Sequence, residues 1–333
     1  MAVETNTPAP EALEEMLMSK TEQQLSSDTA SRQQIVRAEA AIAAKYWGGI
    51  QWRIIATFIA FSVCWCSVIF FGVTGLLTLW QGLLLNSLLA STFYMPMHEA
   101  AHKNIWGKRA TGRWLEDVIG KLCSIPTGIN FSSHREGHMR HHAFTNDPTR
   151  DPDHFTDGRL SELPVKFYGM TMVYSFLPFF ALIKPLRVLL PKDIKQLLND
   201  RQASKGEGKS QIRFWLLSTI ALVVCFATGH GVEALMLWWL PARIQLCWLM
   251  FIFAWFPHHP ANETSRYRHT RVAVFRGSGL LIRGHDHHAV HHLYPRVPHY
   301  KLKALWGELA NDLVSRGVRA EGRSVGAISP VVW

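Results

Sequence analysis

The sequence predicts an all-α integral membrane protein with four transmembrane helices in two hairpins and a helical cap on the cytoplasmic side. Hydrophobic residues make up 48% of the 333 residues and charged residues only 18%, which is more apolar than an ordinary soluble protein. Two apolar runs of 44 residues, 54–97 and 214–257, are each long enough for two crossings. Lys and Arg are absent from the turn of each run and abundant between and after the runs.

Each apolar run has a turn signal near its middle. The first run contains no charged residue, and its FGVTG turn predicts helices over 54–73 and 76–97. The second run turns at TGHGVE, between helices predicted over 214–230 and 234–257. Arg243, inside the fourth predicted helix, either has a function at that depth or reaches toward the outer interface.

The placement of the positive charges orients these helices. Segments 98–213 and 258–333 are rich in Lys and Arg, so they and both termini are expected in the cytoplasm of a bacterial inner membrane or an equivalent membrane. The net charge of +10 is then an orientation signal, and no nucleic-acid partner is expected. We expect a polar leader over 1–45, a membrane domain over 46–321 and a flexible tail over 322–333.

A third apolar stretch, at about 167–190, lies between the two runs. It is interrupted by Pro178 and Pro185 and carries Lys184 and Arg187. A fifth crossing here would place the ends of the second hairpin on the wrong side for their positive charge. We therefore expect a helix that lies in, or dips into, the cytoplasmic interface.

Histidine is the outlier in the composition, with 17 copies that cluster. HEAAH places two histidines four residues apart at the end of the second predicted helix, and HMRHH and HAVHH repeat an HxxHH spacing later in the chain. FPHHP adds two more at the end of the fourth predicted helix. A single histidine on an apolar face is usually structural, whereas clusters gathered at one membrane face predict a metal site in the cytoplasmic cap.

HExxH alone is also the helix motif of zinc proteases. A catalytic zinc takes three protein ligands, and the remaining imidazoles of such a site would be buried without partners at a high cost. The pattern instead favours two redox-active metal ions suited to activating dioxygen, with copper an alternative by ligand type. An intramembrane zinc protease and a non-catalytic metal-binding membrane protein are the alternatives from other classes.

HEAAH, HMRHH and HAVHHLYPRVP resemble the three histidine boxes of the membrane fatty-acid desaturase and hydroxylase superfamily, over residues of about 50–310. The resemblance implies four spanning helices, a cytoplasmic cap and a non-haem diiron centre. By position it implies the iron ligands His98, His102, His138, His141, His142, His258, His288, His291 and His292. We prefer His258 to His259, because a Pro-His dipeptide at this place resembles the carotenoid-hydroxylase branch.

Polar residues beside the histidine boxes are candidates to orient the ligand rings by hydrogen bonding. Each of them has an ordinary alternative as a helix-end, turn or structural residue. The candidates are Glu99, Asn146, Asp151, Asp286, His134 and His285.

The resemblance also implies a reaction, namely the O2-dependent oxidation of an unactivated C–H bond of a lipid by two Fe ions. Desaturation of a fatty acyl chain is our first expectation. Carotenoid or alkyl hydroxylation, and decarboxylation of a fatty acid to a terminal alkene, are alternatives. The chain has no haem, ferredoxin or rubredoxin motif. We therefore expect electrons from a separate protein, a ferredoxin, a rubredoxin or a small haem protein with its reductase, that docks on the basic cytoplasmic face.

Overall fold

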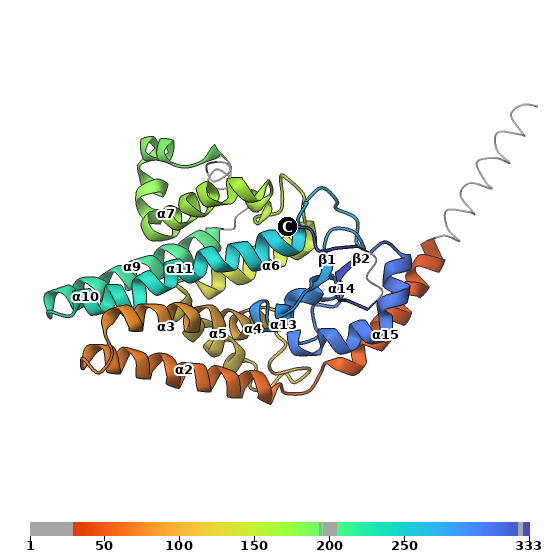
Figure 1. Cartoon of the computed structure of the whole chain (residues 1–333), viewed down its shortest axis with the longest axis horizontal. Helices are drawn as coiled ribbons and strands as arrows, with labels where there is room; N and C mark the ends of the chain where they lie inside the picture. Colours follow the sequence, from red (N-terminus) through yellow and green to blue (C-terminus); the bar gives the residue numbers. More distant parts are fainter. Residues whose placement is uncertain (1–28, 193–194, 196–204, 326–328) are drawn as a thin grey trace, which may run out of the picture. The chain divides into compact units, whose positions relative to one another are not determined.

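The computed structural model describes residues 29–192, 195, 205–325 and 329–333. The chain divides after Lys45 into two units, which are described separately. In the first unit, residues 29–43 are helical. The second unit, Tyr46–Trp333, holds the apolar helices and all the histidines (Figure 1).

Three helices among the described residues are long and apolar enough to cross a membrane. They are α2 (Trp52–Val73), α9 (Lys205–Ala227, with a candidate span over Gly208–Ala227) and a continuous helical stretch from Gly231 to His258. That stretch is built from α10 (Gly231–Ala234), the π-helical η5 (Leu235–Trp239), α11 (Leu240–Leu249), the π-helical η6 (Met250–Trp255) and α12 (Phe256–His258). The predicted mostly helical membrane fold is confirmed at this level.

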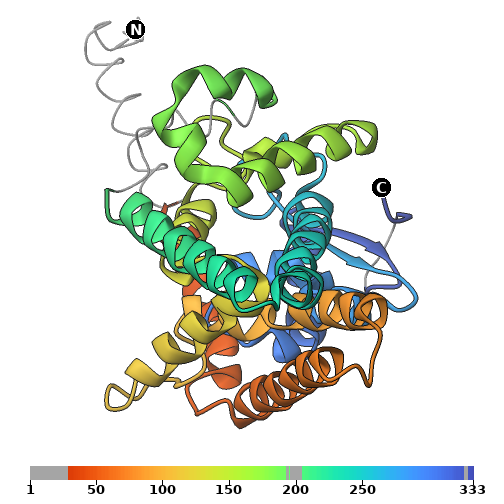
Figure 2. The same cartoon turned by 90° about the vertical axis from the view of Figure 1, so that its left-hand side faces the viewer.

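The helix predicted over 76–97 is divided in the structure. α3 (Leu79–Thr92) ends one residue before Phe93, and α4 (Tyr94–Ala101) follows it. Pro96 has no amide hydrogen to donate to the carbonyl of Thr92, which interrupts the helical hydrogen-bond ladder at this point. α3 packs against both α2 and α11, as seen along these helices in Figure 2.

Leu237 fixes the last apolar stretch to the first hairpin. Its side chain fills the space beside Gly72 of α2 and Gly82 of α3, where a Cβ on either glycine would overlap it. Its carbonyl, in the π-helical η5, accepts a hydrogen bond of 2.7 Å from the buried Nδ2 of Asn86. Small residues and a buried amide thus allow close helix packing in this apolar region.

The apolar stretch expected near the interface forms α7 (Leu163–Leu182) and the 3-10 helix η4 (Lys184–Leu189). α7 kinks at Phe176, two residues before Pro178, as a proline inside a helix requires. α7 packs against α9 and α11. Whether it lies at the membrane surface stays a prediction.

Arg243 of α11 is held by neighbouring residues. Its Nε donates to the hydroxyl of Ser175 on α7 at 2.9 Å, and its guanidinium lies 5.0 Å from the ring centre of Trp239. Its Nη1 is buried without a hydrogen-bond partner. These contacts place the charge against α7.

Further elements lie between and after the apolar helices in the chain. They are α5 (Trp114–Thr127), α6 (Phe131–Phe144), η2 (His154–Thr156), η3 (Leu160–Glu162), β1 (Arg271–Val274), α13 (Ser278–Leu281), η7 (His285–His287), α14 (His288–Leu293), η8 (His299–Lys301), α15 (Leu302–Ser315) and β2 (Arg319–Gly322). α15 buries the leucines and the tryptophan that recur along it at helical spacing, as the sequence predicts.

Two short strands correct the purely helical prediction. β1 and β2 pair in parallel, with Arg271 opposite Arg319. The fully buried guanidinium of Arg271 binds Glu321 at 2.8 Å and donates two hydrogen bonds to the carbonyl of Phe256. Strands of four residues are too short to show an alternating sequence pattern, so the sequence did not reveal them.

The end of the chain also differs from the flexible tail expected over 322–333. The ring of Trp333 lies 4.9 Å from that of Phe256 and 5.3 Å from that of Phe275. The backbone N–H of Val332 donates to Glu321 at 3.1 Å. Aromatic packing and this hydrogen bond hold the described residues 329–333 against the sheet.

Candidate metal centre

Four helical segments that are far apart in the sequence bring histidines together. α4 supplies His98 and, at its C-cap, His102; α6 supplies His138, His141 and His142; α12 supplies His258; and α14 supplies His288, His291 and His292. Histidines three and four residues apart face one side of a helix. His258 of α12 follows the π-helical η6, whose wide turn holds about one residue more than an α-helical turn. This winding sets the direction in which the His258 side chain leaves the helix.

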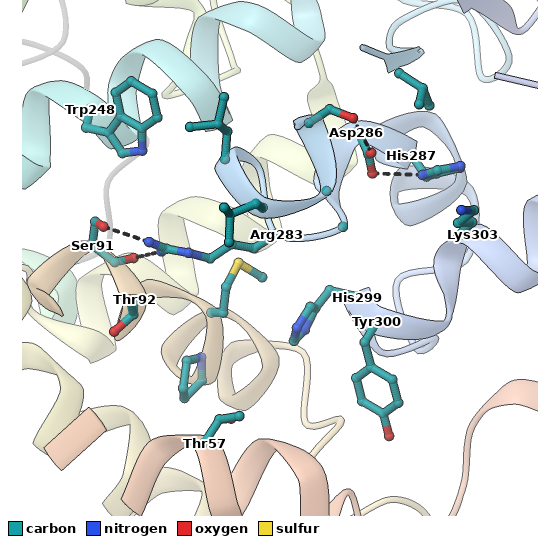
Figure 3. A pocket seen from close by; sticks show the side chains of 18 of the residues that line it. Thr57, Ser91, Thr92, Trp248, Arg283, Asp286, His287, His299, Tyr300 and Lys303 are labelled. Carbon is teal, nitrogen blue, oxygen red and sulfur yellow. Dashed lines mark hydrogen bonds and ion pairs between the residues drawn. The ribbon is translucent and has the colours of Figure 1, made fainter. Parts of the chain in front are cut away.

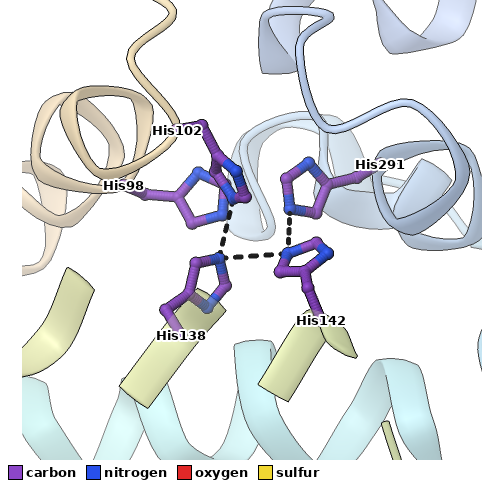
Figure 4. A group of neighbouring side chains, drawn as sticks. All are labelled: His98, His102, His138, His142 and His291. Carbon is purple, nitrogen blue, oxygen red and sulfur yellow. Dashed lines mark hydrogen bonds between the residues drawn. The ribbon is translucent and has the colours of Figure 1, made fainter. Parts of the chain in front are cut away.

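Five of these histidines form a first group, in which one ring nitrogen from each lies within 4.8 Å of the others. The group consists of His98, His102, His138, His142 and His291 (Figure 4). The Nε2 of His138 lies 2.9 Å from that of His102 and 3.2 Å from that of His142. The Nε2 of His291 lies 3.0 Å from that of His142.

The other four histidines form a second group by the same measure, consisting of His141, His258, His288 and His292. The Nε2 of His288 lies 3.0 Å from that of His258 and 3.1 Å from that of His292. The two groups adjoin, because the rings of His142 and His292 stack with centres 4.1 Å apart.

The spacing of the nitrogens fits metal ions better than hydrogen bonds between rings. A neutral imidazole nitrogen carries either one proton or one lone pair, so the Nε2 of His138 cannot hydrogen-bond to both His102 and His142. Both ring nitrogens of His98 are buried without a hydrogen-bond partner. Nitrogens bound about 2.1 Å from one metal ion, at right angles, would lie about 3.0 Å apart. Bound metal ions would account for the observed distances.

Burial keeps the rings of the first group in the form that binds metals. It lowers the pKa of His102 to about 4, and it lowers the pKa of His98 and His138 well below the ordinary value. Neighbouring histidines lower the pKa of His98 and His138 further, since two imidazolium rings repel each other. At neutral pH these rings are uncharged, and each offers a lone pair to a metal ion.

Two side chains orient rings of the second group. Burial alone would lower the pKa of His141, but the Asp151 carboxylate, 2.8 Å from its Nδ1, raises it to about 9. Asp151 thus holds a proton on Nδ1, and Nε2 is the nitrogen at which a metal ion would replace the second proton. The hydroxyl of Thr145 donates to the carbonyl of His141 at 2.8 Å, so it accepts from the Nδ1 of His292 at 3.2 Å.

Asp151 contacts the ring of His141, and its removal tests whether it orients that ring. We expect Asp151→Asn to lower metal retention by about ten- to a hundredfold, because the His141 ring loses its charged partner. Asp147→Asn is the matched control, since Asp147 binds Arg150. The metal content of purified protein is the measurement. Equal losses in both variants would contradict the proposed role.

Two other acids expected to orient ligands hold different histidines. Glu99 accepts from the backbone and ring of His299 at 2.8 and 2.9 Å, and from Asn104 at 2.8 Å. Asp286 accepts from the ring of His287 at 2.8 Å and from Ser278 at 2.7 Å. These bonds join α4 to η8 and η7 to α13, beside the helices that carry ligand candidates.

Of the remaining three candidates, one binds backbone carbonyls and two contact histidine rings. Asn146 donates to the carbonyls of Glu263 and His269, and its own backbone N–H binds Asp151. His134 stacks on His138 with ring centres 5.3 Å apart. His285 lies between the two groups, with its Nδ1 3.2 Å from that of His288. Sequence reasoning did not single out Thr145, because a threonine after a histidine box carries no distinctive signal.

A cavity of about 100 Å³ opens onto the histidines. Its wall on one side is formed by His98, His138, His141, His285 and His288, and elsewhere by mostly apolar side chains such as Ile129, Met170 and Leu249. The cavity is therefore polar on the histidine side and partly apolar opposite it, and its size allows only a small group beside the histidines.

Comparison with known proteins agrees with this site. The sequence model of the family described as fatty acid desaturase matches residues 74–320. The chain belongs to the fatty acid desaturase family. The match begins in the turn of the first hairpin and includes every histidine of both groups.

Desaturase relatives are similar at low identity. A probable fatty acid desaturase from Sorghum bicolor is 26% identical, over 63% of this chain and 58% of the relative. The chloroplastic sn-2 acyl-lipid omega-3 desaturase (ferredoxin) of Arabidopsis thaliana is 23% identical, over 65% and 52%, and a chloroplastic omega-3 fatty acid desaturase of Brassica napus is 22% identical, over 62% and 54%. The chain thus spans a little over half the length of these curated desaturases.

Proposed function

We propose that this desaturase-family protein is an O2-dependent diiron oxidoreductase of a membrane, and that it desaturates a fatty acyl chain. The observation that carries the proposal is the pair of adjoining groups, with five and four buried histidines. A catalytic zinc site needs three protein ligands, so one zinc ion would leave most of these rings unused. Membership of the desaturase family supports the choice of iron and of a lipid substrate.

In this proposal each histidine group holds one iron ion. His98, His102, His138, His142 and His291 hold the first, and His141, His258, His288 and His292 hold the second. When bound, the iron pair supplies the oxidising chemistry that removes hydrogen from an unactivated C–H bond, with O2 and external electrons.

The chain's own residues position the ligands and the substrate. Asp151 and Thr145 hold the Nδ1 protons of His141 and His292, which fixes the rings with Nε2 available for the iron. The apolar side chains of the small cavity beside the histidines would contact the reacting part of the hydrocarbon chain and exclude water from it. Phe253 of η6 also lines this space and packs against Tyr94, with ring centres 4.9 Å apart.

We further propose four crossings, over residues 54–73, 76–97, 214–230 and 234–257, the second of which comprises α3 and the start of α4. Both termini and the metal centre are then cytoplasmic, because the Lys- and Arg-rich segments lie on that side. The domain limits at residues 45 and 321 and the surface helix at about 167–190 belong to this arrangement. A separate electron-transfer protein would dock on the basic face, and one relative is named as ferredoxin-dependent.

Mass spectrometry of lipids and pigments from cells that express the full chain tests the reaction. We expect acyl chains that have lost two hydrogens, and only in the presence of oxygen. A gain of one oxygen would indicate hydroxylation, and loss of a carboxylate would indicate alkene formation. Purified protein should contain two iron ions per chain. One zinc ion, or lipids unchanged with or without oxygen, would refute the proposal.

A further inference from the structure

A second, larger hollow of about 1340 Å³ lies beside α4 and α11, away from the histidine groups (Figure 3). Met95 and Pro96 of α4 line it, whereas Tyr94 and His98 of the same helix line the cavity beside the metal centre. In the same way, some residues of α11 line the larger hollow and others line the cavity beside the metal centre. None of the nine proposed iron ligands lines the larger hollow, which is thus a separate space from the cavity beside the histidines.

The larger hollow is apolar along the membrane helices and cationic toward the cap. Its apolar lining includes Ile54, Phe61, Leu88, Leu89, Ile244, Trp248 and Leu281. Its cations are Arg53, Arg283, Lys303 and Arg323. This combination is complementary to a molecule with a hydrocarbon chain and a negatively charged head.

Arg283 is the most buried of these cations. Its guanidinium donates to the backbone carbonyl of Ser91 and, at 2.8 Å, to the Ser91 hydroxyl, both of which are neutral partners. Burial lowers its pKa to about 10, which leaves it charged at neutral pH. No carboxylate among the described residues forms an ion pair with it. A confined charge without a counter-ion is unfavourable, so an anion in the hollow would stabilise it.

The acid that lines the hollow does not supply this counter-ion. The carboxylate of Asp286 is occupied by the ring of His287 and the hydroxyl of Ser278 (Figure 3). Arg53 lies over the ring of Tyr300 at 4.9 Å, and the side chain of Lys303 is exposed. The cationic end of the hollow therefore keeps an excess of positive charge.

The depth of the cations matches that of lipid phosphates. Arg53 directly precedes Ile54, the first residue of the uncharged run that we assign to the membrane. Phe61 and Leu88 line the hollow on the same two helices, farther into that run. A lipid with its phosphate beside Arg53 would thus place its acyl chain along Phe61 and Leu88.

We propose that this hollow binds a phospholipid with an anionic headgroup, held by Arg283, Arg53 and Lys303, and that this lipid is not the substrate. The site would link α2 and α3 to the cap through one lipid molecule. The proposal rests on the membrane placement given above and is independent of the reaction at the iron site.

Lipid binding to the purified full chain tests the site. Delipidated protein in detergent is titrated with phosphatidylglycerol or phosphatidylcholine of the same acyl chains, and native mass spectrometry gives the apparent dissociation constants. We expect phosphatidylglycerol to bind about tenfold more tightly, and Arg283→Gln to remove that preference, because a hydrogen-bonded charge pair is lost. Lys303→Gln, at an exposed position, should weaken phosphatidylglycerol binding in the same direction.

Arg109→Gln is the matched control, since Arg109 is exposed and lies outside the hollow. It should bind both lipids like the wild type. Equal affinities of the wild type for the two lipids, or an unchanged preference in both Arg283→Gln and Lys303→Gln, would overturn the proposal. So would displacement of phosphatidylglycerol by an equal concentration of a free fatty acid. His291→Ala protein should still prefer phosphatidylglycerol, which separates this site from the proposed reaction.

Discussion

Replacing His291 by alanine is expected to abolish double-bond formation and to reduce the iron content of the purified protein. The ring of His291 is buried, and its Nε2 lies 3.0 Å from that of His142 within the first group. Loss of a hydrogen-bond partner outside the ligand set costs about ten- to a hundredfold in metal affinity or activity, so loss of a ligand should cost more than about 100-fold. Fatty-acid analysis of cells and metal analysis of protein measure the two effects.

His230→Ala is the control for this substitution. His230 is exposed in the turn between α9 and α10, far along the helix from the histidine groups. It should insert into membranes and act like the wild type. A His291→Ala protein that keeps both iron ions and forms double bonds would exclude this residue from the ligand set.

Replacement by alanine should remove most of the activity at His258 but little of it at the neighbouring His259. His258→Ala removes a member of the second group, whose Nε2 lies 3.0 Å from that of His288, and should lower activity by more than about 100-fold. His259→Ala removes a ring that packs on Trp255, with ring centres 4.6 Å apart, and should keep most of the activity. Iron content and acyl products of both variants, expressed side by side, are the measurements.

Each of these two variants is the control for the other, because they are adjacent and change the same side chain. The opposite result, an inactive His259→Ala and an active His258→Ala, would mean that the neighbouring ring is the ligand. Loss of both activities with normal iron content would indicate a structural effect of this segment instead.

The sequence predicted the clustering of the histidines because their spacing is a local property, and the resemblance to the three histidine boxes named the individual members. Residues three and four apart share a helix face whatever the rest of the chain does, and the ends of apolar runs fix where such faces lie along the membrane normal. The Pro-His dipeptide separated His258 from its neighbour by resemblance. The structure places His258 within the second group and His259 outside it.

The hydrogen-bond partners of the ligand candidates were harder to predict, because loops decide them. Glu99 and Asp151 are both acids close in sequence to a histidine box, yet the first meets His299 and the second meets His141. The difference comes from a turn after α6, in which Asp151 returns to accept the N–H of Asn146. No pattern in the sequence specifies such a return.

The sheet and the divided second helix were also outside what periodicity can predict. β1 and β2 are each four residues long and lie 44 residues apart in the chain, so nothing local marks their pairing. Pro96 did signal an interruption, but an apolar run that contains one proline is still read as continuous. Tertiary contacts decide both features.

The orientation of His258 depends on how many residues the helix before it contains and on how they wind, which includes the widened turn of η6, Met250–Trp255. Deleting one amino acid there would restore regular winding and leave that imidazole close to its present orientation, because the wide turn holds about one residue more than an α-helical turn. The same deletion in the regular α11 would instead rotate everything beyond it by about 100° and carry the imidazole away from the second histidine group. Homologues compared by a gapless alignment across this point would have the wrong histidine placed at the iron.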